Sequence, residues 1–160
     1  MYAQHMRALH VVLVEPEIHW NTGNTGRSCL AAGAQLHLVE PLGFSLDAKQ
    51  VQRAGLDYWP RVQPRTWGSW TDFAEALPSL GEPFFLGPRS GRSLFATAFP
   101  ERVVLILGRE STGLPEELLA RHADRVVHLP MRDDALRSLN VSTTAGIAMF
   151  EVLRQWEARA

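Results

Sequence analysis

Residues Val103–Pro115 read Val-Val-Leu-Ile-Leu-Gly-Arg-Glu-Ser-Thr-Gly-Leu-Pro, an apolar run followed by a loop with two glycines. Such a run is typical of a buried strand in a parallel sheet. Two more polar segments follow apolar runs: Asn21–Arg27 comes after Val11–Val14, and Leu129–Ser142 comes after Val126-Val127. In open α/β sheets, ligands bind in the crevice outside the carboxyl ends of the strands. We therefore expect one binding site assembled from three loops.

The composition is that of one soluble globular domain, residues 1–160, long enough to bury a core. The hydrophobic fraction of 46% and the charged fraction of 21% are ordinary for this class. The sequence has neither a membrane-spanning stretch nor an apolar signal-peptide core, so we expect a cytoplasmic protein without membrane contact. Cys29, the single cysteine, cannot form an intramolecular disulfide, and the six histidines lack metal-ligand spacing, so no metal is expected.

The charge balance neither favours nor excludes nucleic-acid binding. A net charge of −1 argues against a strongly basic nucleic-acid binder. Fifteen of the sixteen basic residues are arginine, which suits phosphate recognition. A compositional bias of the genome explains the same ratio.

Short apolar runs alternate with segments of helical character, as in a parallel α/β sheet. The expected strands cover Leu9–Glu15, Leu36–Val39, Pro83–Leu86, Val103–Leu107 and Arg125–Leu129. The expected helices cover Thr22–Ala32 (ended by Gly33), Asp47–Ala54 (ended by Gly55), Ser69–Leu77 (with Pro78 just beyond), Pro115–His122 and Val141–Arg159.

The C-terminal helix has an unusually broad apolar surface. One stripe contains Ala145, Met149, Val152 and Trp156, while Ile147, Phe150 and Leu153 lie largely off it. A surface helix normally shows one apolar face. Two interpretations stay open: a deeply packed final helix, or a helix whose second side is covered by another subunit.

The first loop combines glycines with polar residues. Gly23 and Gly26 permit close approach of the backbone to a ligand, and Asn21 or Thr22 could cap the following helix. Arg27 lies one turn into that helix and is expected to point toward the crevice at the strand ends. An ordinary surface arginine is the alternative.

Two competing enzyme classes fit poorly. A dinucleotide-binding fold would place Glu40 at the end of the second strand, but the first loop has the spacing G-x-x-G instead of G-x-G-x-x-G. No G-x-S-x-G elbow surrounds Ser90, Ser111 or Ser138, which disfavours serine nucleophiles. Cys29 is better explained by core packing.

The second and third loops carry the remaining polar candidates. Glu110 lies between Gly108 and Gly113, and these glycines would let the backbone contact an adenine or ribose, although a capping glutamate is an alternative. Ser138 and Asn140 precede the last helix, and together they exceed what a helix cap needs. We therefore expect one of the two to face a ligand.

Together the three loops resemble the signature motifs of the SPOUT (trefoil-knotted) RNA methyltransferases. The resemblance covers nearly the whole chain and is strongest to the TrmL branch. It includes the stretches Val14–Ile18, His37–Phe44 and Arg53–Tyr58. It implies an α/β fold, a single-domain parallel sheet flanked by helices, with a C-terminal trefoil knot. Deep threading of this kind is an exception among proteins.

The resemblance also implies a function. The family transfers a methyl group from S-adenosylmethionine to the ribose 2′-hydroxyl of the wobble nucleotide, cytidine or modified uridine, in leucine tRNAs, and leaves S-adenosylhomocysteine. It works as a homodimer without a separate RNA-binding domain, so we expect a homodimer through the C-terminal helix that binds the tRNA anticodon stem-loop. The alternatives are a non-catalytic RNA-binding protein on this fold and a 2′-O-methyltransferase for another tRNA or rRNA position.

Residues are carried over by their match to the family motifs. The implied catalytic residues are Asn21, Arg27, Glu110, Ser138 and Asn140. The implied cofactor-binding residues are Leu86, Gly108, Glu110, Gly113, Leu129, Met131 and Ser138. We assign Arg27 to orienting the hydroxyl and its phosphate, since a guanidinium pKa above about 12 makes it a demanding general base. Two positions depart from the pattern, because close relatives often have asparagine at Thr143 and proline at Arg109.

Overall fold

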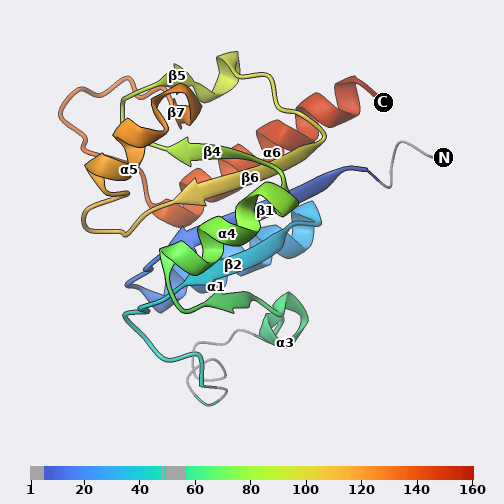
Figure 1. Cartoon of the computed structure of the whole chain (residues 1–160), viewed down its shortest axis with the longest axis vertical. Helices are drawn as coiled ribbons and strands as arrows, with labels where there is room; N and C mark the ends of the chain where they lie inside the picture. Colours follow the sequence, from blue (N-terminus) through green and yellow to red (C-terminus); the bar gives the residue numbers. More distant parts are fainter. Residues whose placement is uncertain (1–5, 48, 50–56) are drawn as a thin grey trace.

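The computed structural model describes residues 6–47, 49 and 57–160, which form a seven-stranded parallel sheet with helices on both faces (Figure 1). The strands are β1 (Ala8–Val14), β2 (Gln35–Val39), β3 (Arg65–Trp67), β4 (Glu82–Leu86), β5 (Arg92–Ser93), β6 (Arg102–Leu107) and β7 (Val126–His128). The helices are α1 (His19–Ala32), α3 (Trp59–Val62), α4 (Trp70–Leu80), α5 (Glu116–Arg121) and α6 (Val141–Ala158), with 3₁₀ turns at Leu94–Ala96 and Ala123–Arg125. The expected parallel sheet flanked by helices is confirmed.

The strand order is β3-β2-β1-β6-β4-β7-β5. The centre of the sheet is the long pairing of β1 with β6, whose register runs from Ala8 opposite Arg102 to Leu13 opposite Leu107. Because every pairing is parallel, the carboxyl ends of the strands meet along one edge. This edge is where the expected site has to form.

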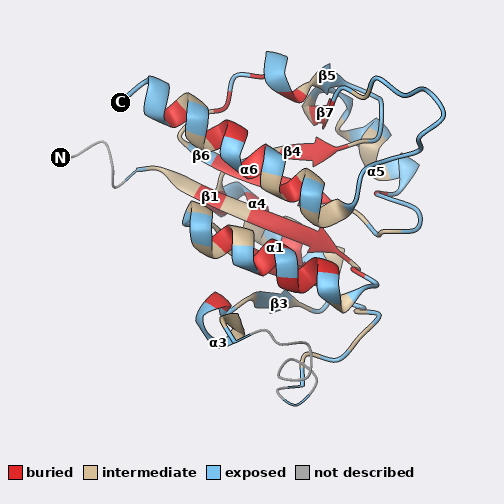
Figure 2. Cartoon of the chain, turned by 180° about the vertical axis from the view of Figure 1, so that it is seen from behind, coloured by how far each residue is buried: buried red, intermediate tan, exposed pale blue. Residues whose placement is uncertain are grey.

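Alternation along the strands creates two buried layers. Val11 and Leu13 of β1 face the layer of α1 and α6, and Val12 and Val14 face the layer of α4 and α5. Figure 2 shows buried residues along β1, α1 and α6. The sheet is therefore covered on both faces, as parallel sheets require.

The chain follows an uncommon path at strand β7. It lies between β4 and β5, which are joined by only residues 87–91. That connection runs against β7: the amide of Gly87 donates to the carbonyl of Val127 at 2.9 Å. Gly91 has φ +79°, and a Cβ there would lie 2.1 Å from the carbonyl oxygen of Val126. The chain that carries β7 thus passes beneath a connection formed earlier in the sequence.

The expected helix Thr22–Ala32 is confirmed, but it begins one turn earlier, so the whole first motif is helical instead of a loop. Helix α1 begins at His19, and neither Asn21 nor Thr22 caps it. Glycine, asparagine and threonine are poor helix formers, which favours a later start. Tertiary packing outweighs that preference, because Gly23 accepts a hydrogen bond from the Tyr58 hydroxyl at 2.9 Å.

Other boundaries differ locally from those expected. Pro78 lies inside the last turn of α4 instead of beyond its end, while Ser69 caps this helix by accepting from the amide of Asp72. The short elements α3, β3 and β5 were not predicted. The expected helix Asp47–Ala54 falls almost wholly outside the described residues. The last helix matches its expected bounds to within one residue.

A buried polar cluster crosses three neighbouring strands. The His37 side chain is fully buried, lies 2.9 Å (Nε2) from His10 Nδ1, and accepts at Nδ1 from the Trp67 indole at 3.1 Å. Burial lowers the pKa of His37 to about 3, with smaller contributions from His10 and Arg65. Accepting at Nδ1 leaves the proton on Nε2, which donates to His10. The hydrogen bonds of this cluster can therefore all form only while both imidazoles are neutral.

This cluster predicts acid sensitivity. Below its ordinary pKa of 6.5, His37 binds a proton in the unfolded chain but not in the folded one, down to a pH of about 3. Stability should therefore be retained above pH 6.5 and fall as the pH drops, by up to about 1.4 kcal/mol per pH unit from this group. We expect His37→Leu to be less stable than the wild type at pH 7.5 but to lose stability less steeply between pH 6.5 and 4. Urea denaturation at a series of pH values measures both, and equal slopes would contradict the assignment.

Candidate active site

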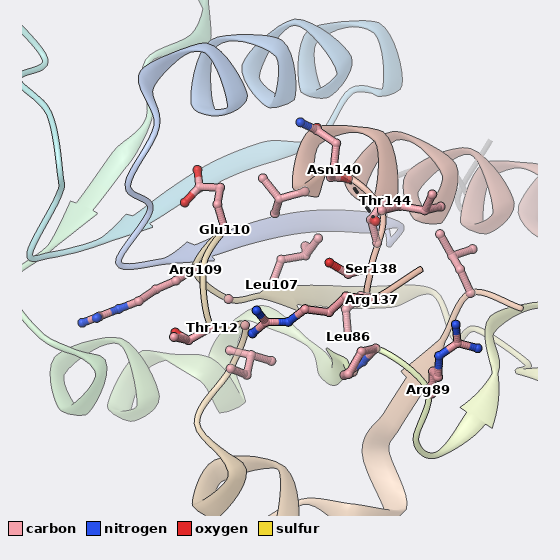
Figure 3. Close-up of a pocket in the computed structure, with 18 of the residues that line it drawn as sticks. Leu86, Arg89, Leu107, Arg109, Glu110, Thr112, Arg137, Ser138, Asn140 and Thr144 are labelled. Atoms are coloured by element: carbon pink, nitrogen blue, oxygen red, sulfur yellow. Dashed lines mark hydrogen bonds between the residues drawn. The ribbon is translucent and has the colours of Figure 1, made fainter. Parts of the chain in front are cut away.

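A pocket of about 930 Å³ opens at the carboxyl edge of the sheet (Figure 3). Its floor contains Leu86 at the end of β4, Leu107 at the end of β6 and Leu129 just after β7. Its walls come from residues 87–90, from the loop after β6 and from the segment between β7 and α6. The volume suits a ligand of cofactor size, for which pockets run to roughly 1,000 Å³.

The structure brings almost all of the expected site residues to this pocket. The seven residues expected to bind cofactor all line it: Leu86, Gly108, Glu110, Gly113, Leu129, Met131 and Ser138. Asn21 and Asn140 also line it. Arg27 does not.

Arg27 lies on the outside of α1. Its side chain is exposed, and its guanidinium lies 5.6 Å from the centre of the Tyr58 ring. Six residues separate it from Asn21, which places it about a third of a turn away around the helix. Within one chain, the expectation that Arg27 points into the crevice is therefore not met.

Asn21, Glu110 and Asn140 form one chain of hydrogen bonds across the three motifs. The Asn140 amide donates to Asn21 Oδ1 at 2.9 Å, and the Asn21 amide donates to Glu110 Oε1 at 3.2 Å. Glu110 also accepts from the backbone amides of Glu17 and Ile18 at 2.7 and 3.1 Å. Its carboxylate thus satisfies amides at the start of α1, where Ile18 offers no side-chain cap and negative charge is favoured. Glu110 is a cap, but for α1 and not for the helix that follows it.

Ser138 and Asn140 divide the two tasks expected of them. Asn140 Oδ1 accepts from the amides of Ser142 and Thr143, at 2.9 and 3.3 Å, and so caps α6. Ser138 lines the pocket from the segment before the cap. In Figure 3, Ser138 lies among the side chains that line the pocket, while Asn140 lies at the start of α6.

The loop after β6 closes tightly on itself. The amide of Gly113 donates to the carbonyl of Arg109 at 2.8 Å, and the amide of Arg109 donates to the carbonyl of Gly113 at 3.3 Å. A Cβ on Gly108 would lie 2.1 Å from the carbonyl carbon of Gly113 and 2.2 Å from the amide of Leu114. Gly108 is thus required by its own loop, a close approach that the sequence had led us to attribute to a ligand.

Sequence reasoning missed several residues that hold the site. Glu17 accepts from both the amide and the hydroxyl of Ser111, at 3.0 and 2.6 Å, and this contact lowers the pKa of the Glu17 carboxyl. Arg109 pairs with Glu15, so the position that departs from the family pattern also joins the second motif to the end of β1. Two glutamates two residues apart, directly after a strand, were the available signal.

The pocket lining carries both signs of charge. Arg89, Arg109 and Arg137 supply positive charge, and Glu110, Glu116 and Asp134 supply negative charge. Such a lining fits a ligand that itself has groups of both signs. Across residues 6–47, 49 and 57–160, no three histidine, cysteine or acidic side chains are placed to hold a metal ion. The described helices include none long and apolar enough to cross a membrane.

The chain is similar in sequence to known RNA methyltransferases. Residues 8–150 match the model of the SpoU rRNA Methylase family. A tRNA (cytidine(34)-2'-O)-methyltransferase from Burkholderia cenocepacia is 45% identical over 148 residues, covering 91% of this chain and 94% of that protein. Another protein of the same name, from Burkholderia pseudomallei, is 43% identical and is covered to 94%.

Solved structures agree with this result. One, described as giving structural insights into the 2-OH methylation of C/U34 on tRNA, is 44% identical with a TM-score of 0.87 over 96% of this chain and 99% of the other. The SpoU methyltransferase AviRb from Streptomyces viridochromogenes, in complex with AdoMet, is 25% identical with a TM-score of 0.76. The alignment with it covers 94% of this chain and 61% of AviRb.

The closed loop after β6 generates a prediction. Gly108→Ala should displace residues 113 and 114 and weaken S-adenosylmethionine binding by at least about tenfold, because the new Cβ overlaps backbone. Gly33→Ala is the matched control: a Cβ there meets nothing within 4 Å, φ +70° makes it strained by about 1 kcal/mol, and Gly33 does not line the pocket. Calorimetric titration and thermal unfolding of both variants check this. A folded Gly108→Ala protein with normal affinity would show that the close approach is not needed.

Proposed function

Because the chain belongs to the SpoU rRNA methylase family, we propose that it methylates the ribose 2′-hydroxyl of nucleotide 34 in tRNA. The chain is an S-adenosylmethionine-dependent methyltransferase with the trefoil-knot fold of its relatives. The observation that carries the proposal is the convergence of all three motifs on one pocket. Its substrates, by the same proposal, are leucine tRNAs recognised at the anticodon stem-loop.

The pocket fits S-adenosylmethionine. Leucines at the strand ends offer apolar contact for an adenine, and the backbone of the closed loop offers donors and acceptors. The side chains of both charges match a ligand that carries a carboxylate, an ammonium and a sulfonium group. The cofactor supplies an electrophilic methyl group, so the main task of the protein is to position the two reacting atoms.

We propose that the polar chain of Asn140, Asn21 and Glu110 receives the ribose. Asn21 and Asn140 line the pocket, and their mutual hydrogen bonds fix the orientation of both amides. Ser138, whose hydroxyl borders the same space, completes the set of polar groups for the target hydroxyl. Glu110 contributes by holding Asn21 and the start of α1 in place.

Arg27 is proposed to act on the ribose phosphate in the pocket of a second copy. Ile147 and Phe150 leave an apolar face of α6 exposed, by 36% and 49%, while Ala145, Met149 and Val152 are fully buried. Helices α1 and α6 lie side by side in one layer (Figure 2). A homodimer through α6 therefore also brings α1 against the partner, and Arg27 with it.

Two measurements test the function itself. Calorimetric titration with S-adenosylmethionine separates an enzyme from an RNA-binding protein that has lost cofactor binding. Mass-spectrometric nucleoside analysis of tRNA from a deletion strain identifies the methylated nucleotide. Loss of 2′-O-methylation at position 34 of leucine tRNAs is the expected result, and loss at another tRNA or rRNA position would overturn the proposed site.

Arg27 gives a sharp prediction. Arg27→Ala should keep the fold and the cofactor affinity, while methyl transfer falls by about 100-fold or more, because misplaced reacting groups are costly. Arg27→Lys keeps the charge but loses the planar fork, so it should recover little. Single-turnover methylation of a leucine tRNA measures this, and near-normal transfer by Arg27→Ala would remove the residue from the mechanism.

Mixed dimers test whether Arg27 acts across the interface. Co-expression of Arg27→Ala with Asn140→Ala chains leaves one pocket with both residues intact only if Arg27 comes from the partner. We then expect activity in the mixture although each parent is inactive. An inactive mixture of folded chains would place both residues in one subunit.

The α6 face predicts a dimer at micromolar concentration. Phe150→Glu should shift the sedimentation equilibrium toward monomer, because the exposed ring would otherwise be buried against the second copy. Circular dichroism controls for folding. A fully active wild-type monomer would contradict the proposed interface.

A further inference from the structure

Within the described part of the chain, one wall of the pocket is not held in place by backbone hydrogen bonds to its neighbours. Residues 131–139, here called the covering segment, join β7 to α6 without helix or strand, and nearly all of them are exposed. Seven residues of this segment line the pocket: Met131 and residues 134–139. Among the described residues, no backbone–backbone hydrogen bond joins the covering segment to another part of the chain. Side chains therefore have to hold it.

On one side, Arg89 holds the covering segment. Its Nη2 donates to the carbonyls of Asp133 and Leu136, both at 2.7 Å. Asp133 Oδ1 accepts from the amides of Ala135 and Leu136 at 2.8 and 2.9 Å, which folds residues 133–136 into a turn. The turn presents two carbonyls to one guanidinium. Arg89 belongs to the connection that crosses β7, so this contact ties the covering segment to the knot.

On the other side, Arg137 reaches out from the covering segment. Its Nη2 donates to the carbonyl of Ser111 at 2.8 Å, and Figure 3 shows it extending toward the loop that carries Thr112. Ser111 is itself fixed, because its amide and hydroxyl both donate to Glu17. Arg137 therefore binds the carbonyl of a residue that is itself held to Glu17, just before α1.

We propose that Arg89 and Arg137 form a latch that holds the covering segment over the cofactor and sets how tightly S-adenosylmethionine is retained. The proposal rests on the location of the cofactor in this pocket under the proposed function. Both are positioning residues, since they act through backbone carbonyls. Hydrogen bonds from a charged donor are the stronger kind, and the three that these arginines donate hold a segment that has no backbone hydrogen bonds to the rest of the described chain.

Two readouts test the latch. The first is cleavage of the cofactor-free protein by an endoproteinase that cuts before aspartate, at Asp133 and Asp134, which no variant alters. The second is the KM for S-adenosylmethionine against kcat. Arg89→Ala and Arg137→Ala should each speed cleavage and raise the KM by on the order of tenfold, with a much smaller change in kcat. Arg89→Lys should recover part of both effects, since an ammonium also has several donors.

Arg92→Ala and Arg121→Ala are the matched controls. Both residues are exposed arginines outside the pocket lining, one just after the connection that crosses β7 and one at the end of α5, and neither makes a side-chain hydrogen bond to another described residue. They remove the same charge without removing the latch, so wild-type cleavage and KM are expected.

The outcomes separate the latch from the proposed function. A raised KM without faster cleavage of the cofactor-free protein would mean that the arginines contact the cofactor directly, and would overturn the latch. Equal effects in the control variants would mean that loss of a positive charge, and not loss of the latch, causes the faster cleavage and the higher KM. Failure of the wild-type protein to bind S-adenosylmethionine would defeat the proposed function, while the cleavage experiment would still decide whether the arginines hold the segment.

Discussion

The carboxylate of Glu110 is the contact on which the site depends. It comes from the loop after β6 and accepts from the amides of Glu17 and Ile18, just before α1, and from Asn21, which in turn meets Asn140 at the cap of α6. Three segments from distant parts of the sequence are thereby held in one geometry. The donors are two backbone amides and one side-chain amide, and hydrogen bonds to a carboxylate are of the stronger, charge-assisted kind. Glutamate meets this need because its charge and its two oxygens serve several donors at once.

Most of the fold could be predicted because it rests on strong local patterns. Strands β1, β2, β4, β6 and β7 are apolar runs between polar segments, and α6 follows the Asn140 cap. What could not be predicted depends on partners far away in the sequence. The first turn of α1 was not predicted, because Asn21, Gly23 and Gly26 locally oppose a helix, while Tyr58 and Trp59 pack against the two glycines from far along the chain. Strand β5 has two residues and exists only because β7 pairs with it.

The site also has features that the sequence predicts and features that depend on distant partners. Residue types and their position after strands were enough to bring Gly108, Ser138 and Asn140 to one pocket. The role of each residue could not be predicted, because Gly108 is required by the packing of its own loop and Glu110 caps a helix that begins about ninety residues earlier. The role of Arg27 could not be predicted from the crevice of its own subunit, because the residue lies on the outer side of α1. Under the proposed homodimer, that side of α1 faces the second copy.

The crossing of residues 87–91 over β7 also constrains the order of assembly. A strand that lies beneath a finished connection cannot be added to the edge of a sheet by simple zipping. Either the following chain, including α6, is drawn under that connection, or the connection is laid over β7 after it has docked. Leu86, Leu129 and residues 87–90 all line the pocket, so the two sides of the crossing are also two of its walls. A complete cofactor site therefore exists only in a chain whose crossing has formed, and binding of the cofactor reports that the chain is threaded.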